Sequence, residues 1–297
     1  MINFNADLID DLARSKVVLF LGAGVSASAK TAAGNNIKQW EEFLKEATTH
    51  IQDATTRKIV LRFIKEKKYL FASELLKEHL EDKWGDILKD EFSLLAGPSD
   101  LQKAIVKLDQ RILITTNFDG LLEQAYIEVN KNNSHITHSP RVIHKIDSKV
   151  FRSLRDNYSY IIKLHGDIQN IDSIVFDISS YHDKAYANTY YKDFLNSLLL
   201  THTFLFIGFS MSDPAISMLI EMFAHRFPES RPHYILSSSK FSDKEIALWK
   251  LKRKLYVHTY SSASNHSELT SSIEELCNQV KNRRAELLAE DNLIAKI

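Results

Sequence analysis

The chain has 297 residues, enough to bury a full hydrophobic core in one large domain or two modest ones. Lysine plus arginine and aspartate plus glutamate each number 38, so the formal net charge is zero. A neutral chain lacks the overall positive charge that draws proteins to DNA, RNA or anionic membranes, so we expect no direct nucleic-acid partner and no membrane partner.

The N-terminal residues and the cysteine content favour a cytoplasmic location. Residues 1–14 contain Asp7, Asp10 and Asp11 and lack the basic stretch of a signal peptide. No apolar run reaches the ~20 residues of a membrane helix. Cys277 is the single cysteine, which excludes an intramolecular disulfide and fits a reducing compartment.

Short β-type runs alternate with helical patterns along the chain, which is typical of an α/β fold. Several of these runs are apolar throughout, as in strands covered by helices on both faces. We therefore predict a Rossmann-like, doubly wound, largely parallel sheet with a helical insertion. The expected strands are Lys16–Leu21, Arg111–Thr115, Tyr160–Leu164, Ser173–Phe176, Thr203–Ile207, His233–Leu236 and Leu255–His258.

Residues 51–109, between the first two expected strands, show helical periodicity and no strand pattern. For example, apolar residues recur at helical spacing between Ala72 and Leu80. Because the α/β pattern resumes on both sides, we expect an insertion packed on the sheet rather than a separate domain. The Rossmann-like domain would then comprise residues 1–50 and 110–297.

Three helices are readable after the second strand. Residues Gly120–Val129 carry one apolar stripe. Asp213 is an expected N-cap, and Pro214 follows it at the first helical position. A last amphipathic helix is expected from about Leu269 to Leu287.

The first expected strand runs directly into Gly22-Ala23-Gly24, with Ser26 close behind. Glycine permits a tight turn and a close approach of the backbone to a ligand, and the N–H groups at the start of a following helix suit a pyrophosphate. Ala27 occupies the position of the third glycine in the dinucleotide fingerprint, so we do not expect an ordinary dehydrogenase site. The alternative is that these glycines serve only the turn.

Two further strands also end in polar residues. Asn117 and Asp119 follow the strand Arg111–Thr115, and His165 follows Tyr160–Leu164. We expect Asp119 mainly to cap the next helix, whereas the Asn117 amide can donate and accept hydrogen bonds at the strand end. His165 can titrate near neutral pH, although a loop histidine with purely structural contacts is the common case.

A later strand ends in Gly208 and Ser210. The carboxyl ends of parallel strands lie at one edge of a sheet, where doubly wound folds bind their ligands. We therefore predict a nucleotide cleft formed by the loops of Gly24, Asn117, His165 and Ser210. The alternative is an unrelated α/β protein whose glycine turns are structural.

Four motifs in this order resemble the motif set of the sirtuin superfamily, most closely its bacterial sirtuin-like branch. The motifs are Gly22-Ala23-Gly24-Val25-Ser26, Thr116-Asn117-Phe118-Asp119, Leu164-His165-Gly166 and Gly208-Phe209-Ser210 with Asp213-Pro214. The resemblance spans roughly residues 16 to 225. It implies a Rossmann-like fold with NAD lying across the strand ends as the substrate.

The resemblance also implies roles for the matching residues. Asn117 and His165 would be catalytic: Asn117 would position the ribose hydroxyls or a water, and His165 would act as a general base. The residues implied to bind NAD are Gly22, Ala23, Gly24 and Ser26 at the pyrophosphate, Asp119 near the nicotinamide ribose, and Gly208 and Ser210 toward the adenosine half.

The chain departs from the sirtuin deacylases in two respects. Their small zinc module needs four cysteines, and this chain has one, so we expect no zinc and no other metal. A histidine substitute from His135, His138 and His144 is disfavoured because that stretch contains no cysteine. The deacylase segment Gly-Ile-Pro-Asp-Phe-Arg is also absent, which weakens the case for acyl-lysine recognition.

The function expected from this resemblance is hydrolysis of NAD to nicotinamide and ADP-ribose by an NAD-depleting effector of bacterial anti-phage defence. Relatives of this branch work with HerA-like ATPases or other sensors, so an activating partner and a homo-oligomer are expected. Two alternatives stay open: a non-enzymatic module that binds NAD or ADP-ribose, and a sirtuin-type deacylase or ADP-ribosyltransferase. Hydrolysis and cyclisation of the ADP-ribose product are not separated by the sequence.

Overall fold

The computed structural model describes residues 1–131 and 139–294, with side chains up to residue 290. Within these residues seven strands form one sheet in the order β3-β4-β2-β1-β5-β6-β7, and every neighbouring pair is parallel. The strands are β1 Val17–Leu21, β2 Ile112–Thr115, β3 Arg141–Ile143, β4 Tyr160–Lys163, β5 Thr203–Ile207, β6 His233–Ser237 and β7 Leu255–Thr259.

The sheet is doubly wound about its central strand. From β1 the chain first builds β2, β3 and β4 on one side, and it then crosses to build β5, β6 and β7 on the other. The winding direction therefore reverses between β1 and β5, and this is the point where open α/β sheets bind ligands. The predicted Rossmann-like α/β fold is confirmed.

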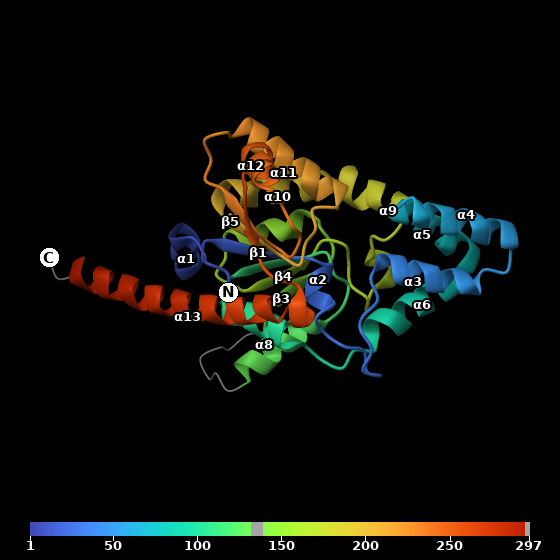
Figure 1. Cartoon of the computed structure of the whole chain (residues 1–297), viewed down its shortest axis with the longest axis horizontal. Helices are drawn as coiled ribbons and strands as arrows, with labels where there is room; N and C mark the ends of the chain where they lie inside the picture. Colours follow the sequence, from blue (N-terminus) through green and yellow to red (C-terminus); the bar gives the residue numbers. More distant parts are fainter. Residues whose placement is uncertain (132–138, 295–297) are drawn as a thin grey trace.

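Helices cover both faces of the sheet (Figure 1). The longer ones are α1 Ala6–Ala13, α3 Trp40–Ala47, α4 Ala54–Lys65, α5 Tyr69–Leu80, α6 Asp82–Ser93, α7 Asp100–Lys107, α8 Leu121–Asn130, α10 Thr189–Thr201, α11 Pro214–Arg226, α12 Asp243–Arg253 and α13 Ala263–Ile294. Alternate residues of β1 face opposite layers: Phe20 packs in the cluster of α10 and α11, and Leu19 packs in that of α1, α7 and α13. None of the described helices has the length and apolarity needed to cross a membrane.

Helices α3 to α6 form a group to one side of the sheet (Figure 1). Residues 51–109 are helical from α4 through α7, as their periodicity predicts. Helix α7 packs with α8 and α13, whereas α3 packs with α4 and α5. The division of the chain into residues 1–50 with 110–297 and an insertion at 51–109 stays a prediction.

An aromatic cluster connects this helical group to the sheet. It is made of Trp40, Phe43, Trp84, Phe92, Phe118 and Phe176. Phe118 follows β2, and its ring lies 5.7 Å from that of Phe92 and 5.4 Å from that of Phe176. The loop after β2 therefore shares a core with α3 and α6.

Two strand assignments differ from the sequence prediction. Ser173–Phe176 is not a strand: Val175 packs with the sheet, whereas Ile174 and Phe176 pack with the helical group. The apolar side chains of this segment are buried in two different hydrophobic cores, and its backbone does not pair with a strand of the sheet. Strand β3, Arg141–Ile143, was not predicted, because it is a short and largely exposed edge strand without an apolar run.

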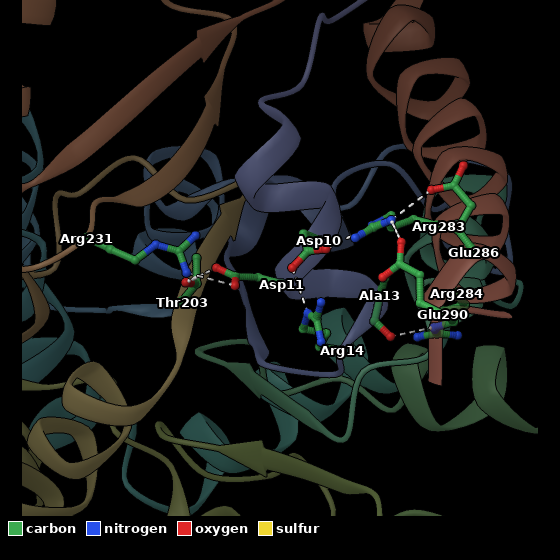
Figure 2. Close-up of polar contacts among 10 residues, drawn as sticks. All are labelled: Asp10, Asp11, Ala13, Arg14, Thr203, Arg231, Arg283, Arg284, Glu286 and Glu290. Carbon is green, nitrogen blue, oxygen red and sulfur yellow. Dashed lines mark hydrogen bonds and ion pairs between the residues drawn. The ribbon is translucent and has the colours of Figure 1, made fainter. Parts of the chain in front are cut away.

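The N-terminal helix α1 is fixed to the rest of the chain by polar contacts (Figure 2). Arg283 on α13 donates from Nε to Asp10 Oδ1 at 2.9 Å. On the other side of α1, Thr203 Oγ1 donates to Asp11 Oδ2 at 2.7 Å, and Arg231 donates to Oδ1 at 3.0 Å. These bonds join α1 to both α13 and the start of β5.

Candidate active site

Four loops follow the four neighbouring strands β4, β2, β1 and β5 at the carboxyl edge of the sheet. In the sheet register Leu21 pairs with Thr115 on one side and with Ile207 on the other, and Thr115 pairs with Lys163. The loops that carry Gly22, Asn117, His165 and Gly208 therefore start at the same level. The predicted grouping of the four motifs at one edge is found.

The loops after β1 and β5 are packed backbone against backbone. Gly24 N donates to Gly208 O at 2.9 Å. A Cβ on Gly22 would lie 2.5 Å from Gly208 O, and one on Gly24 would lie 2.9 Å from Gly208 Cα. Gly208 also has a φ of +62°, which favours glycine. These glycines are thus required by the contact between two turns, and Ala23 and Gly24 are exposed above it.

The loop after β2 is tied to the loop after β1 through Ser26. Asn117 Nδ2 donates to Ser26 Oγ at 2.7 Å and to Gly22 O at 3.0 Å. Ser26 Oγ in turn donates to Asp119 Oδ2. All three side chains are buried, so this network fixes the two loops relative to each other.

Asp119 was expected to cap helix α8, but the N-cap position is Gly120, and Asp119 stands one residue before it. Its Oδ1 accepts from Leu121 N at 3.0 Å. Burial raises the pKa of this carboxyl, while the hydrogen bonds from Ser26 and Leu121 act in the opposite direction. Asp119 therefore bonds the first residue of α8 as well as Ser26.

His165 joins the loop after β4 to the loop after β5. Its side chain is buried, and Nε2 lies 3.2 Å from Asp213 Oδ2. Its carbonyl oxygen accepts from Val175 N at 2.9 Å. The next residue, Gly166, has a φ of +88°, and a Cβ there would lie 2.3 Å from Ser173 O. The backbone that carries the histidine is thus closely held.

Asp213 was predicted only as the N-cap of α11, and it does accept from Ile216 N at 2.9 Å through Oδ1. The same oxygen accepts from Tyr181 Oη at 2.6 Å. Burial alone would raise the pKa of Asp213, but the contact with His165 and the hydrogen bonds from Ile216 and Tyr181 outweigh it and lower the pKa. Neither the histidine contact nor Tyr181 was predicted, because no local pattern reports a contact between distant parts of a chain.

Lys163, at the end of β4, is a second unpredicted polar residue near the site. Its side chain is 1% exposed, and Nζ lies 2.7 Å from both Glu123 Oε1 and Asp167 Oδ2. Burial alone would lower the pKa of Lys163, but the two carboxylates outweigh it and raise the pKa. A charged residue inside an apolar strand was the available signal, since a buried lysine requires an anionic partner.

Ser210 and the three histidines considered as metal ligands have no described contact with the network of Asn117, Ser26 and Asp119. Ser210 is exposed, and its Oγ lies 2.7 Å from Ser212 Oγ in the same loop. His135 and His138 lie outside the described residues. In the part of the chain that is described, no three His, Cys, Asp or Glu side chains are grouped to hold a metal ion.

The arrangement offers a base, an amide and a buried carboxylate beside a glycine turn. Contacts between named atoms link the loop of Gly24 to that of Gly208, the loop of Asn117 to that of Ser26, and the loop of His165 to that of Asp213. A neutral imidazole can accept a proton near pH 7, and an amide can orient hydroxyl groups. This set suits hydrolysis of a ligand lying across the strand ends.

Comparisons with known proteins agree with the motifs. Residues 111–258 match the family model described as the SIR2-like domain. The chain is 28% identical over 289 residues to the NAD(+) hydrolase ThsA of Enterococcus faecium, covering 89% of this chain and 55% of that protein. It is 23% identical over 296 residues to the NAD(+) hydrolase ThsA of Bacillus cereus, covering 94% of this chain and 58% of that protein.

More distant likenesses include the defense-associated sirtuin 2 of Bacillus subtilis, 22% identical over 187 residues, with 61% of this chain and 18% of that protein covered. Among solved structures, the crystal structure of a SIR2 homolog–NAD complex aligns with a TM-score of 0.43 at 13% identity, covering 95% of this chain and 96% of the other. The chain spans about half the length of the ThsA relatives named above.

Proposed function

We propose that the chain, of which residues 111–258 match the SIR2-like domain, hydrolyses NAD to nicotinamide and ADP-ribose at the carboxyl edge of its sheet. The observation that carries the proposal is the connection of the loops of Gly24, Asn117, His165 and Asp213 at the switch point between β1 and β5. The names of the ThsA relatives support the same activity.

NAD would lie across the glycine turn. Ala23 and Gly24 are exposed there, and Gly24 has no side chain, so a pyrophosphate can approach the backbone of the turn. The nicotinamide ribose would lie toward Asn117, with Ser26 and Asp119 holding the amide from below. The adenosine half would extend over the loop of Gly208 and Ser210.

The reaction breaks the bond between C1′ of the ribose and the nicotinamide nitrogen. The bonding electron pair leaves with nicotinamide, which becomes neutral, and positive charge develops on the ribose. A water oxygen then bonds to C1′, and its proton passes to His165. Asn117 would orient the ribose hydroxyls or the water, and each of these roles needs the group within hydrogen-bond reach. The products are nicotinamide, ADP-ribose and one proton.

The proposal extends to the biological role. Similarity to ThsA and to a defense-associated sirtuin supports an NAD-depleting effector of bacterial anti-phage defence. A cytoplasmic location fits the single, half-buried Cys277. A homo-oligomer and an activating partner such as a HerA-like ATPase belong to the same proposal, and sedimentation alone and with candidate partners tests them.

Product analysis by HPLC tests the activity. Purified protein is incubated with NAD, with and without candidate partners, as wild type, Asn117→Ala and His165→Ala. We expect nicotinamide and ADP-ribose from the wild type, and a loss of about 10²–10⁴-fold in the His165 variant. The matched controls are Asn196→Ala and His225→Ala, two exposed helical positions, which should keep wild-type turnover.

Three results would count against the proposal. Full activity in His165→Ala would remove the assigned base. NAD that binds but stays intact with every partner would favour a non-enzymatic binding module. Product that forms only when an acceptor protein is added would favour a deacylase or an ADP-ribosyltransferase.

A further inference from the structure

Asp213 has more hydrogen-bonding capacity at its position than a helix cap uses. Capping α11 needs one oxygen, and Oδ1 supplies it to Ile216 N at 2.9 Å. Asparagine, serine or threonine would cap equally well. The second oxygen, Oδ2, is directed to His165 Nε2 at 3.2 Å, and both side chains are 9% exposed. Capping alone does not explain a buried carboxylate that faces a histidine.

Tyr181 fixes the orientation of the Asp213 carboxylate. Its hydroxyl donates to Oδ1 at 2.6 Å and accepts from Ala215 N at 2.9 Å, so it has both a donor and an acceptor contact. Its ring packs edge-on against His165, with 5.9 Å between the ring centroids. Two donors on Oδ1 leave Oδ2 as the free acceptor, and this is the oxygen next to the histidine.

His165 Nε2 is buried and makes no hydrogen bond of regular geometry to any of the described residues. Its contact with Asp213 Oδ2 at 3.2 Å is an ion-pair contact. The titratable groups around the pair are Tyr181 and, further from the carboxylate, Tyr186 and Tyr191, which are neutral near pH 7. Asp213 is the carboxylate that contacts the ring within the described residues.

We propose that Asp213 is the positioning residue of the catalytic histidine: it holds the proton of His165 on Nε2 and leaves Nδ1 as the basic nitrogen, with Tyr181 keeping the carboxylate in place. In a neutral imidazole one nitrogen donates and the other accepts, so the group that binds one nitrogen decides which is the base. An anion beside the ring also stabilises the imidazolium formed once the proton of water has been taken.

The expected effect of Asp213 on kcat rests on the proposed hydrolysis of NAD. The expected position of the His165 proton does not, so it can be tested separately. The geometry is tested by ¹⁵N NMR of the histidine side chains in the protein without NAD, with the His165 signal assigned from its loss in His165→Gln. We expect wild-type His165 to carry its proton on Nε2 near pH 8. A proton on Nδ1 in the wild type would overturn the proposal, whether or not NAD is cleaved.

Kinetics test the consequence with Asp213→Asn. Asparagine keeps the cap of α11 but removes the charge and places either an amide oxygen or a donor against Nε2. We expect kcat to fall by about 10²–10⁴-fold with KM for NAD little changed. Asp213→Glu, which keeps a carboxylate, should recover part of kcat.

Tyr181→Phe is the second variant and Asp53→Asn the control. Loss of one hydrogen bond to a charged group should lower kcat by about tenfold in Tyr181→Phe. Asp53 caps α4 at an exposed position through Thr55 N and Thr56 N, so its variant should keep wild-type kcat. An active wild type whose kcat is unchanged by Asp213→Asn would overturn the proposal. A wild type that leaves NAD intact would instead refute the proposed function.

Discussion

Ser26 and Asp119 are joined by a buried hydrogen bond, although 93 residues separate them in the chain. Ser26 follows β1 and Asp119 follows β2, two strands that are neighbours in the sheet. Asn117 Nδ2 donates a hydrogen bond to the same Ser26 hydroxyl. One serine therefore holds two groups that would lie around the nicotinamide ribose.

Ser26→Ala removes a donor from Asp119 and an acceptor from Asn117. Because both groups are buried, we expect the free energy of unfolding to fall by about 1–3 kcal/mol, and NAD hydrolysis to fall further than the folded fraction. Urea unfolding and HPLC of the products measure the two effects. Ser271→Ala, at an exposed position of α13, is the control and should change neither.

Gly166→Ala tests the turn behind His165. A Cβ at this position would lie 2.3 Å from Ser173 O, and the backbone has a φ of +88°. We expect a loss of unfolding free energy of at least about 1–3 kcal/mol in urea, with a fall in NAD turnover as the histidine shifts. Gly120→Ala is the matched control, since its Cβ would meet nothing within 4 Å. Equal stability of the two variants would contradict the prediction.

Lys163→Met leaves Glu123 and Asp167 without their shared cation. Removing one partner of a buried ion pair costs about 3–5 kcal/mol, and we expect a loss of that size in unfolding free energy near pH 7. Lys103→Met is the control, because Lys103 pairs with Glu128 at the surface and should matter by less than about 1 kcal/mol. A loss of unfolding free energy below about 1 kcal/mol in Lys163→Met would contradict the prediction that Lys163 forms stabilising buried ion pairs.

His233 predicts an acid-sensitive stability. Burial lowers the pKa of His233 to about 4, while the unfolded chain keeps a value near 6.5. Between these two pKa values the unfolded state therefore binds more protons than the folded state. The contribution of His233 to the free energy of unfolding is fully present above pH 6.5 and is lost as the pH falls toward 4. The expected loss from pH 7 to pH 5 is about 2 kcal/mol for this group.

Urea unfolding of wild type and His233→Asn at pH 7, 6 and 5 checks this slope. Asparagine can keep the bond that His233 Nδ1 accepts from Phe204 N at 3.1 Å. The variant should show a shallower dependence, with the remainder contributed by His258 and His202, whose pKa values burial also lowers. An identical slope in both proteins would argue against His233 as the main source.

The strands at the centre of the sheet could be predicted because each is a short, continuous apolar run. Val17–Leu21 and Thr203–Ile207 are apolar throughout, since helices cover both of their faces. The segment around Ile174 imitates that pattern for a different reason, because its side chains are divided between two cores. The edge strand Arg141–Ile143 has no such constraint and leaves no apolar signal.

The site was predictable only as far as it follows strand ends. Asn117 and His165 could be singled out because each stands two residues beyond a buried strand. Tyr181 lies in a short helix, Ile178–Tyr181, far along the chain, and only the folded structure brings its hydroxyl to Asp213. Lys163 was visible as a charge in a strand. Asp167 stands only four residues further along the chain, but the contact with Glu123 depends on the packing of α8.

Phe118 stands between Asn117 and Asp119, and its ring belongs to the aromatic cluster of the helical group. A substitution such as Phe92→Ala, made well outside the turn that would receive the pyrophosphate, can therefore tilt the peptide units on both sides of Phe118. Distance from the proposed NAD site is thus a poor guide to which substitutions abolish the proposed activity, and a screen for inactive variants should recover positions on α3 and α6 as well as those at the strand ends.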